Sequence, residues 1–275
     1  MKRLILVLVI SGLFAFYLSA QSFVRSFQKA LDDRNIPKME EILKAWDQAD
    51  ANDPELYIAY LNFYTVRSRA ANVLSITGYD QKYSKMALDY ISEGIKRFPM
   101  RFDFRVVKIY MLGELRNYKE YVAEVMDMIR YSAKIENNWK REEFMLLDKS
   151  EVMFYDAVLE AQSFLFSKGD PALLKEIIRI SEEMLKYYPG HIQSFISMSR
   201  VYREQKEENK ALEILLQAIR IDPINTILVY NIANMYKIKG DYPNSMKYYE
   251  LAVKYARSDE ENIKEAALRN LAELK

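Results

Sequence analysis

The sequence repeats itself at a spacing of 34 residues. Residues of the same class recur at this spacing in six pairs: Pro189 and Pro223, Phe195 and Val229, Met198 and Ile232, Tyr202 and Tyr236, Leu215 and Tyr249, and Ala218 and Ala252. A fixed period of this length is typical of arrays in which each repeat is one supersecondary unit that buries its apolar face against its neighbours. The repeat therefore constrains the fold to a stack of similar units.

Each unit reads as a pair of helices. Apolar positions are three and four residues apart in both halves of a unit, and a short polar break separates the two halves. Asp222-Pro223 ends the second half, because proline disfavours a helical residue before it. The chain has only 7 glycines and 7 prolines among 275 residues, which also favours helix. The sequence predicts an all-α protein.

The pattern resembles the tetratricopeptide repeat (TPR). One unit matches its signature at Phe195, Met198-Ser199, Tyr202, Ala211, Leu215, Ala218 and Pro223. The next unit matches at Val229, Ile232-Ala233, Tyr236, Gly240, Tyr249 and Ala252, with Ser245 and Arg257 in place of the alanine and the proline. The resemblance implies stacked helical hairpins whose first helices line a concave groove.

Weaker copies of the unit precede these two. Its second half recurs at Ile42, Trp46, Ala49 and Pro54, and again at Ala87, Ile91, Gly94 and Pro99. Two stretches, 74–83 and 134–150, exceed the repeat and are interpreted as insertions, and Gly169-Asp170-Pro171 as the corner of another hairpin. We expect a single domain over 21–275, an α-solenoid of about six TPR-like hairpins, strongest at 192–225 and 226–258, with a capping helix in 259–275.

The first twenty residues have the form of a secretory signal peptide. Lys2 and Arg3 precede an apolar run that ends at Ser19-Ala20. The run is short for a membrane span, so cleavage is favoured over a retained anchor, with no membrane span afterwards. The chain has no cysteine and no Asn-x-Ser/Thr acceptor, which is more typical of bacterial export than of eukaryotic secretion. We expect a periplasmic or extracellular protein.

Neither nucleic-acid binding nor catalysis finds support in the residues. The 40 basic and 39 acidic side chains nearly cancel, so the chain has no general attraction for nucleic acid. His191 is the one histidine, which excludes a two-histidine metal site, and we interpret it as a surface turn residue. Glycine-rich phosphate loops are absent. We expect no catalytic residue, no metal site and no cofactor.

The resemblance instead points to a binding surface on the first helices. It implies that the groove is lined by Gln193, Ile196, Arg200 and Arg203 in one unit and by Ile227, Tyr230, Asn234 and Lys237 in the next. Each set shares one helix face, and its mixture of apolar and basic side chains suits a peptide. The alternative is that the apolar members pack against the neighbouring repeat. A carboxylate clamp known in some TPR proteins is not expected, because Ile196 and Tyr230 stand where it needs basic residues.

Three functions remain open at this point. The first is a non-enzymatic scaffold of the bacterial envelope that binds a protein or peptide partner in the groove. The second is an envelope protein that binds a glycan or small ligand, with or without hydrolase activity, through aromatic residues near 74–83 and 134–150, among them Trp139. The third is self-association. The aromatic stripe of Tyr57, Tyr60, Phe63 and Tyr64 fits a sugar platform, but a helical core better.

Overall fold

The computed structural model describes residues 22–71, 78–142, 145–146 and 149–274. The predicted signal peptide, 1–20, lies outside the described residues. Contacts divide the chain into two compact units, one made of 1–124 with 135–151 and the other of 125–134 with 152–275. The single-domain organisation therefore stays a prediction. No helix in the described ranges is long and apolar enough to cross a membrane.

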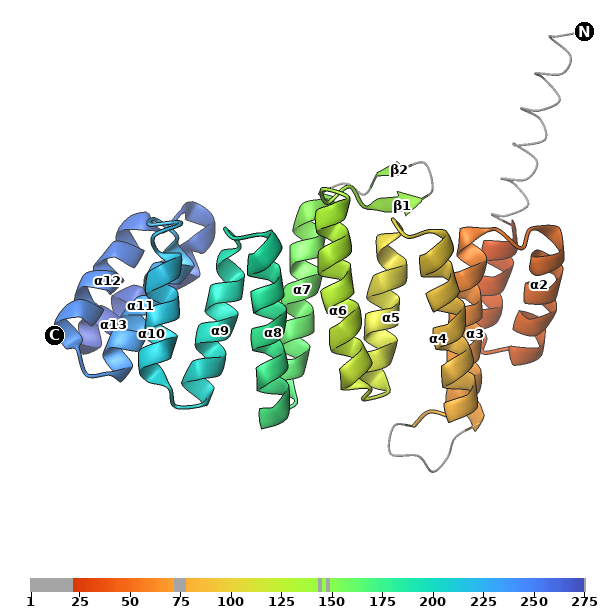
Figure 1. Ribbon diagram of the computed structural model, residues 1–275, viewed down its shortest axis with the longest axis horizontal. Helices are drawn as coiled ribbons and strands as arrows, with labels where there is room; N and C mark the ends of the chain where they lie inside the picture. Colours follow the sequence, from red (N-terminus) through yellow and green to blue (C-terminus); the bar gives the residue numbers. More distant parts are fainter. Residues whose placement is uncertain (1–21, 72–77, 143–144, 147–148, 275) are drawn as a thin grey trace, which may run out of the picture. The chain divides into compact units, whose positions relative to one another are not determined.

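The helices of the first unit run antiparallel in sequence order (Figure 1). Residues 22–32 are helical and precede α2 (Ile36–Ala49), α3 (Pro54–Ala71), α4 (Gln81–Arg97), α5 (Phe102–Glu114) and the start of α6 (Tyr118–Lys134). A buried ion pair joins α5 to α6, because Arg105 Nη1 donates to Glu124 Oε1 at 3.1 Å. Consecutive helices thus form hairpins, as the sequence predicts.

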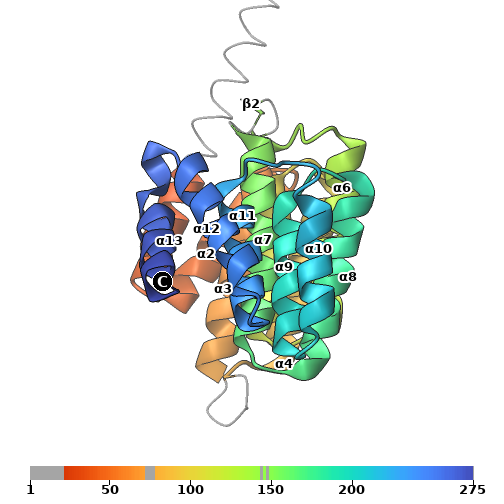
Figure 2. The ribbon, with the colours of Figure 1, turned by 90° about the vertical axis from the view of Figure 1, so that its left-hand side faces the viewer.

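The second unit continues the same arrangement (Figure 1). It contains α7 (Ser150–Ser167), α8 (Pro171–Tyr187), α9 (Ile192–Glu204), α10 (Glu208–Ala218), α11 (Thr226–Ile238), α12 (Tyr242–Tyr255), the short 3-10 helix η1 (Ser258–Glu260) and α13 (Glu261–Glu273). Figure 2 shows α11, α12 and α13 packed at the C-terminal end. The predicted all-α architecture of about six TPR-like hairpins followed by a capping helix is confirmed over the described residues.

Small side chains hold each pair of helices together. Ala211, Leu215 and Ala218 of α10 are buried, as are Ala233 of α11 and Ala252 of α12. Small residues at these positions let two helices approach closely, so that the larger neighbours fill the remaining space. Ser245, which replaces the expected alanine in α12, is fully buried and donates a hydrogen bond from Oγ to the Ala233 carbonyl at 3.0 Å.

The turns between paired helices require left-handed backbone. Gly240 has φ of 74°, and Asp241 Oδ1 then accepts a hydrogen bond from the Asn244 amide at 3.2 Å, which caps α12. Gly169 and Asp170 do the same before α8. Lys206, at the turn between α9 and α10, also has a positive φ of 61° although it is not glycine. The turn geometry is thus kept even where the sequence gives no glycine signal.

The additional residues of the second hairpin lie partly in its helices. We expected them in a loop at 74–83, but α4 already begins at Gln81, so Gln81 to Tyr83 are helical. Helices α3 and α4 have 18 and 17 residues, whereas α9 and α10 have 13 and 11. Tyr79 is buried at the start of this hairpin and donates to Glu114 Oε2 at 3.2 Å. The insertion therefore lengthens the hairpin as well as its turn.

The 134–150 stretch contains a short strand pair. Strand β1 (Lys140–Glu142) pairs antiparallel with β2 (Met145–Leu146), a small departure from an all-α fold. Trp139, just before β1, is fully buried, and its ring centre lies 5.4 Å from that of Phe102. Trp139 and Tyr79 are therefore core residues. The expectation that aromatic rings near the two insertions are open to stack on a sugar is wrong for both.

The aromatic stripe of α3 is a core feature, in agreement with the interpretation favoured by its spacing. Tyr57 and Phe63 are buried. Tyr60 stacks on Tyr90 of α4 with ring centres 4.2 Å apart, and Tyr64 lies 5.6 Å from the same ring. These stacked rings pack α3 against α4, and their faces are occupied by one another.

Gly94 tests how closely these helices approach. A methyl group added there would lie 3.0 Å from Phe104 Cε2 and 3.1 Å from Tyr57 Cβ, and both neighbours are buried. We expect Gly94→Ala to lower the free energy of unfolding by about 1 kcal/mol, since overpacking outweighs the gain in helix propensity. Urea unfolding followed by circular dichroism measures the change. Gly190→Ala, where nothing lies within 4 Å, is the matched control and should be neutral.

Candidate functional site

Two hollows flank α9. The hollow between α7 and α9 has a volume of about 180 Å³ and is lined by Leu159, Gln162, Ser163, Phe166, Ile177, Gln193, Ile196, Ser197 and Arg200. The hollow between α9 and α11 has a volume of about 80 Å³ and is lined by Ile196, Ser199, Arg200, Arg203, Leu215, Asn231 and Met235. Ile196 and Arg200 belong to both, so they form the ridge between the two.

The repeat explains why the hollows recur. Ser163, Ser197 and Asn231 lie 34 residues apart and occupy equivalent positions on α7, α9 and α11. Serine at the first two positions leaves open a space that a leucine would fill. The spacing of 34 was the signal that could have identified these three residues, but polar residues beside the core do not stand out in an apolar pattern.

Gln162 fixes the polar wall of the α7–α9 hollow. Its side chain is only 2% exposed. Its Oε1 accepts a hydrogen bond from Ser197 Oγ at 2.9 Å, and its Nε2 donates to Ser181 Oγ at 2.8 Å. The amide is therefore held in one orientation by α8 and α9 together, and the wall is formed before any ligand arrives.

The charged groups of both hollows are exclusively basic. Arg200 stacks on Phe166 of α7, with its guanidinium carbon 3.6 Å from the ring centre. Arg200 and Arg203 are exposed, and neither has a carboxylate partner within the described residues. Neither lining includes an aspartate or a glutamate. Two uncompensated guanidinium groups beside apolar Ile196 favour a ligand that carries carboxylate or other anionic groups.

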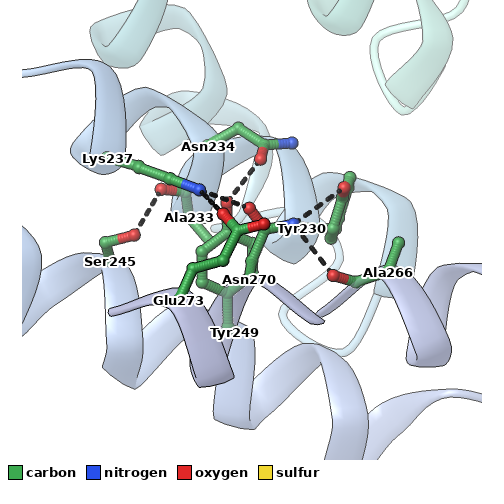
Figure 3. A network of polar contacts seen from close by, with 9 residues as sticks. All are labelled: Tyr230, Ala233, Asn234, Lys237, Ser245, Tyr249, Ala266, Asn270 and Glu273. Atoms are coloured by element: carbon green, nitrogen blue, oxygen red, sulfur yellow. Dashed lines mark hydrogen bonds and ion pairs between the residues drawn. The ribbon is translucent and has the colours of Figure 1, made fainter. Parts of the chain in front are cut away.

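The predicted residues of α9 come together, whereas those of α11 face a different neighbour. Gln193, Ile196, Arg200 and Arg203 all line a hollow. Ile227 and Tyr230 are half-buried outside both linings. Lys237 Nζ donates to Asn270 Oδ1 at 2.8 Å and to Glu273 Oε2 at 2.6 Å, both on α13 (Figure 3). That hydrogen bond lowers the pKa of the Glu273 carboxyl.

Two further contacts join the predicted α11 residues to the capping end of the array. Tyr249 donates from its hydroxyl to Asn234 Oδ1 at 2.5 Å, and Asn270 Nδ2 donates to the Tyr230 hydroxyl at 3.5 Å (Figure 3). Burial raises the pKa of Tyr249 to about 12, so this phenol stays a neutral donor. For this second set of residues, packing against the neighbouring helix is the arrangement that the structure shows.

His191 precedes α9 and is more buried than a surface turn residue. Its ring centre lies 4.7 Å from that of Tyr155, and its Nδ1 lies 2.9 Å from Ser194 Oγ. Burial lowers the pKa of His191 to about 4. Over the described residues, no group of three or more histidine, aspartate or glutamate side chains is arranged to hold a metal ion.

The buried histidine predicts a loss of stability in mild acid. Its ordinary pKa is 6.5 and its folded pKa about 4, so between these values the unfolded chain binds a proton that the folded chain does not. The free energy of unfolding should therefore fall by about 1 kcal/mol between pH 7 and pH 5.5, allowing for partial solvent screening. Urea titrations at the two pH values measure it. The same fall in His191→Gln would contradict this assignment.

The comparisons agree with the repeat. The family model described as tetratricopeptide repeat matches residues 192–225 and 228–259. A comparison with curated proteins gave no match.

Several solved structures of helical-repeat proteins resemble the chain. A thermophilic TPR protein of Thermus thermophilus is 15% identical, with 68% of this chain and 91% of that chain covered and a TM-score of 0.41. YrrB, described as a TPR protein with an unusual peptide-binding site, is 13% identical, with 82% and 97% covered and a TM-score of 0.40. MamA of Desulfovibrio magneticus is 13% identical, with 71% and 94% covered and a TM-score of 0.36. The C-terminal part of the chain, which supplies α9 to α12, is thus built of tetratricopeptide repeats.

Proposed function

We propose that the protein is a non-enzymatic scaffold of the bacterial cell envelope that binds a segment of a partner protein along α7, α9 and α11. The observation that carries this proposal is the charge of the two hollows. Arg200 and Arg203 are their only charged residues, and neither is neutralised by a carboxylate in the described part of the chain. A partner that brings anionic side chains supplies the missing charges.

The size of the hollows favours a polypeptide over a compact small molecule. Pockets for drug-sized ligands and cofactors usually have volumes of about 300–1,000 Å³. The hollows here have volumes of about 180 and 80 Å³ and lie on opposite sides of α9. Two side-chain-sized hollows separated by a helix match an elongated ligand that places one side chain in each.

The envelope location rests on the sequence of the first twenty residues. A basic start, an apolar run and small residues at Ser19-Ala20 have the form that export machinery recognises. The absence of cysteine means that the folded protein does not depend on the redox state of its compartment.

Site-specific cross-linking tests the groove. We expect the photoreactive residue p-benzoylphenylalanine at Gln193 to give protein adducts in cells, because Gln193 lines the α7–α9 hollow. The same residue at exposed Lys247, outside both linings, should give none. Immunoblotting and mass spectrometry of the adducts provide the measurement.

The adducts must also depend on charge. Combining Arg200→Glu with Arg203→Glu should reduce the Gln193 adducts at least tenfold, since two attractive charges become repulsive. The matched control combines Arg220→Glu with Lys247→Glu, which changes the same charge at exposed positions outside the hollows. Adducts that survive the first pair of substitutions as well as the second would refute the groove as the binding site.

Export has its own test. The chain expressed in a Gram-negative host should be recovered from the periplasmic fraction, with a mature N-terminus within a few residues of Gln21. N-terminal sequencing gives the cleavage position. Recovery of the uncleaved chain from the cytoplasm alone would contradict the envelope location and leave the groove proposal standing.

A further inference from the structure

The positions of the two hollows constrain the conformation of the bound segment, an inference that rests on the proposed function. We propose that the partner segment binds as a polyproline II helix that carries an apolar and an acidic side chain three residues apart. The apolar side chain enters the hollow between α7 and α9, and the acidic side chain reaches Arg203 in the hollow between α9 and α11.

The separation of the hollows follows from helix packing. One hollow lies between α7 and α9, and the other between α9 and α11, so their centres are one helix spacing apart. Packed helices are separated by about 8–10 Å. The ridge of Ile196 and Arg200 lies between the hollows, so a ligand must cross this ridge in an extended form.

Polyproline II matches this separation and the common direction of both hollows. It rises by about 3.1 Å per residue with three residues per turn, so side chains three apart point the same way at about 9 Å. A β-strand places same-face side chains at about 7 or 13 Å, which misses the spacing. An α-helix requires six or seven residues between the two side chains and is about 10–12 Å wide.

The linings decide which side chain enters which hollow. The larger hollow has an apolar floor of Leu159, Ile177 and Ile196, which suits a leucine-sized side chain. Arg203 lines only the smaller hollow, so the uncompensated charge is greatest there. An acidic side chain therefore belongs on the α11 side of the ridge and an apolar one on the α7 side.

The rim offers hydrogen bonds that a polyproline II backbone needs. Such a backbone has no internal hydrogen bonds, so its carbonyl and amide groups must find partners or water. The Gln193 side chain is half-buried on the rim and makes no hydrogen bond within the described residues. Asn231 donates from Nδ2 to the Ile227 carbonyl at 2.8 Å, which leaves its Oδ1 to accept from a ligand amide.

Selection from a displayed library of random twelve-residue peptides tests the spacing. The full mature chain is immobilised, and bound peptides are sequenced and then measured by fluorescence anisotropy. We expect enrichment of an aliphatic and an acidic residue three apart, in one common chain direction, with proline between or beside them. Moving the acidic residue by one position should weaken the Kd at least tenfold.

Three variants assign the two side chains. Ser197→Leu, which fills the larger hollow, should remove the preference for the aliphatic residue and keep that for the acidic one. Arg203→Gln should do the reverse, while the matched Arg220→Gln, outside both linings, should change neither. Circular dichroism confirms that each variant is folded.

The outcomes separate this inference from the proposed function. Acidic peptides selected with no fixed spacing, or with a spacing of six or seven, would overturn the polyproline II inference and leave the groove as a peptide site. Failure to select any peptide that depends on Arg203 would overturn both.

Discussion

The close contact between paired helices at small side chains is the interaction on which the rest of this structure depends. Ala233 and Ala252 are fully buried where α11 and α12 meet, and Ser245 replaces an alanine there without leaving its hydroxyl unsatisfied. Because the helices approach closely on one side, the larger residues are free to fill the seams with adjacent hairpins. The spacing of the first helices, and hence the hollows beside α9, follows from these contacts.

Most of the fold could be predicted from the sequence because it is written at a fixed period. Pairs such as Phe195 and Val229 are buried, and the corners at Gly169 and Gly240 lie where the pattern places them. The insertions were harder, since an apolar run does not show whether added residues lengthen a helix or its turn. Trp139 illustrates the difficulty: a tryptophan in a polar stretch suggests exposure, but its ring is buried against Phe102.

The candidate site was predictable in part. A shared helix face brings Ile196, Arg200 and Arg203 together, and periodicity alone suffices to find it. The α11 set has the same spacing, yet its polar members contact α13. No pattern on α11 could reveal this, because the outcome depends on the helix that comes next. The residues of α7 were also missed, since the repeat signal is weak there and Phe166 has no counterpart of its own class on α9.

The ion pair between Lys237 and Glu273 has a consequence for where a ligand stops. The first helices α9 and α11 both carry basic residues toward the same side of the repeat, but only those of α9 keep an uncompensated charge. The capping helix thus marks a boundary in the electrostatic field as well as the end of the apolar core. A ligand that follows positive charge along the array would halt one hairpin before the end, so α13 sets the position at which a partner is read.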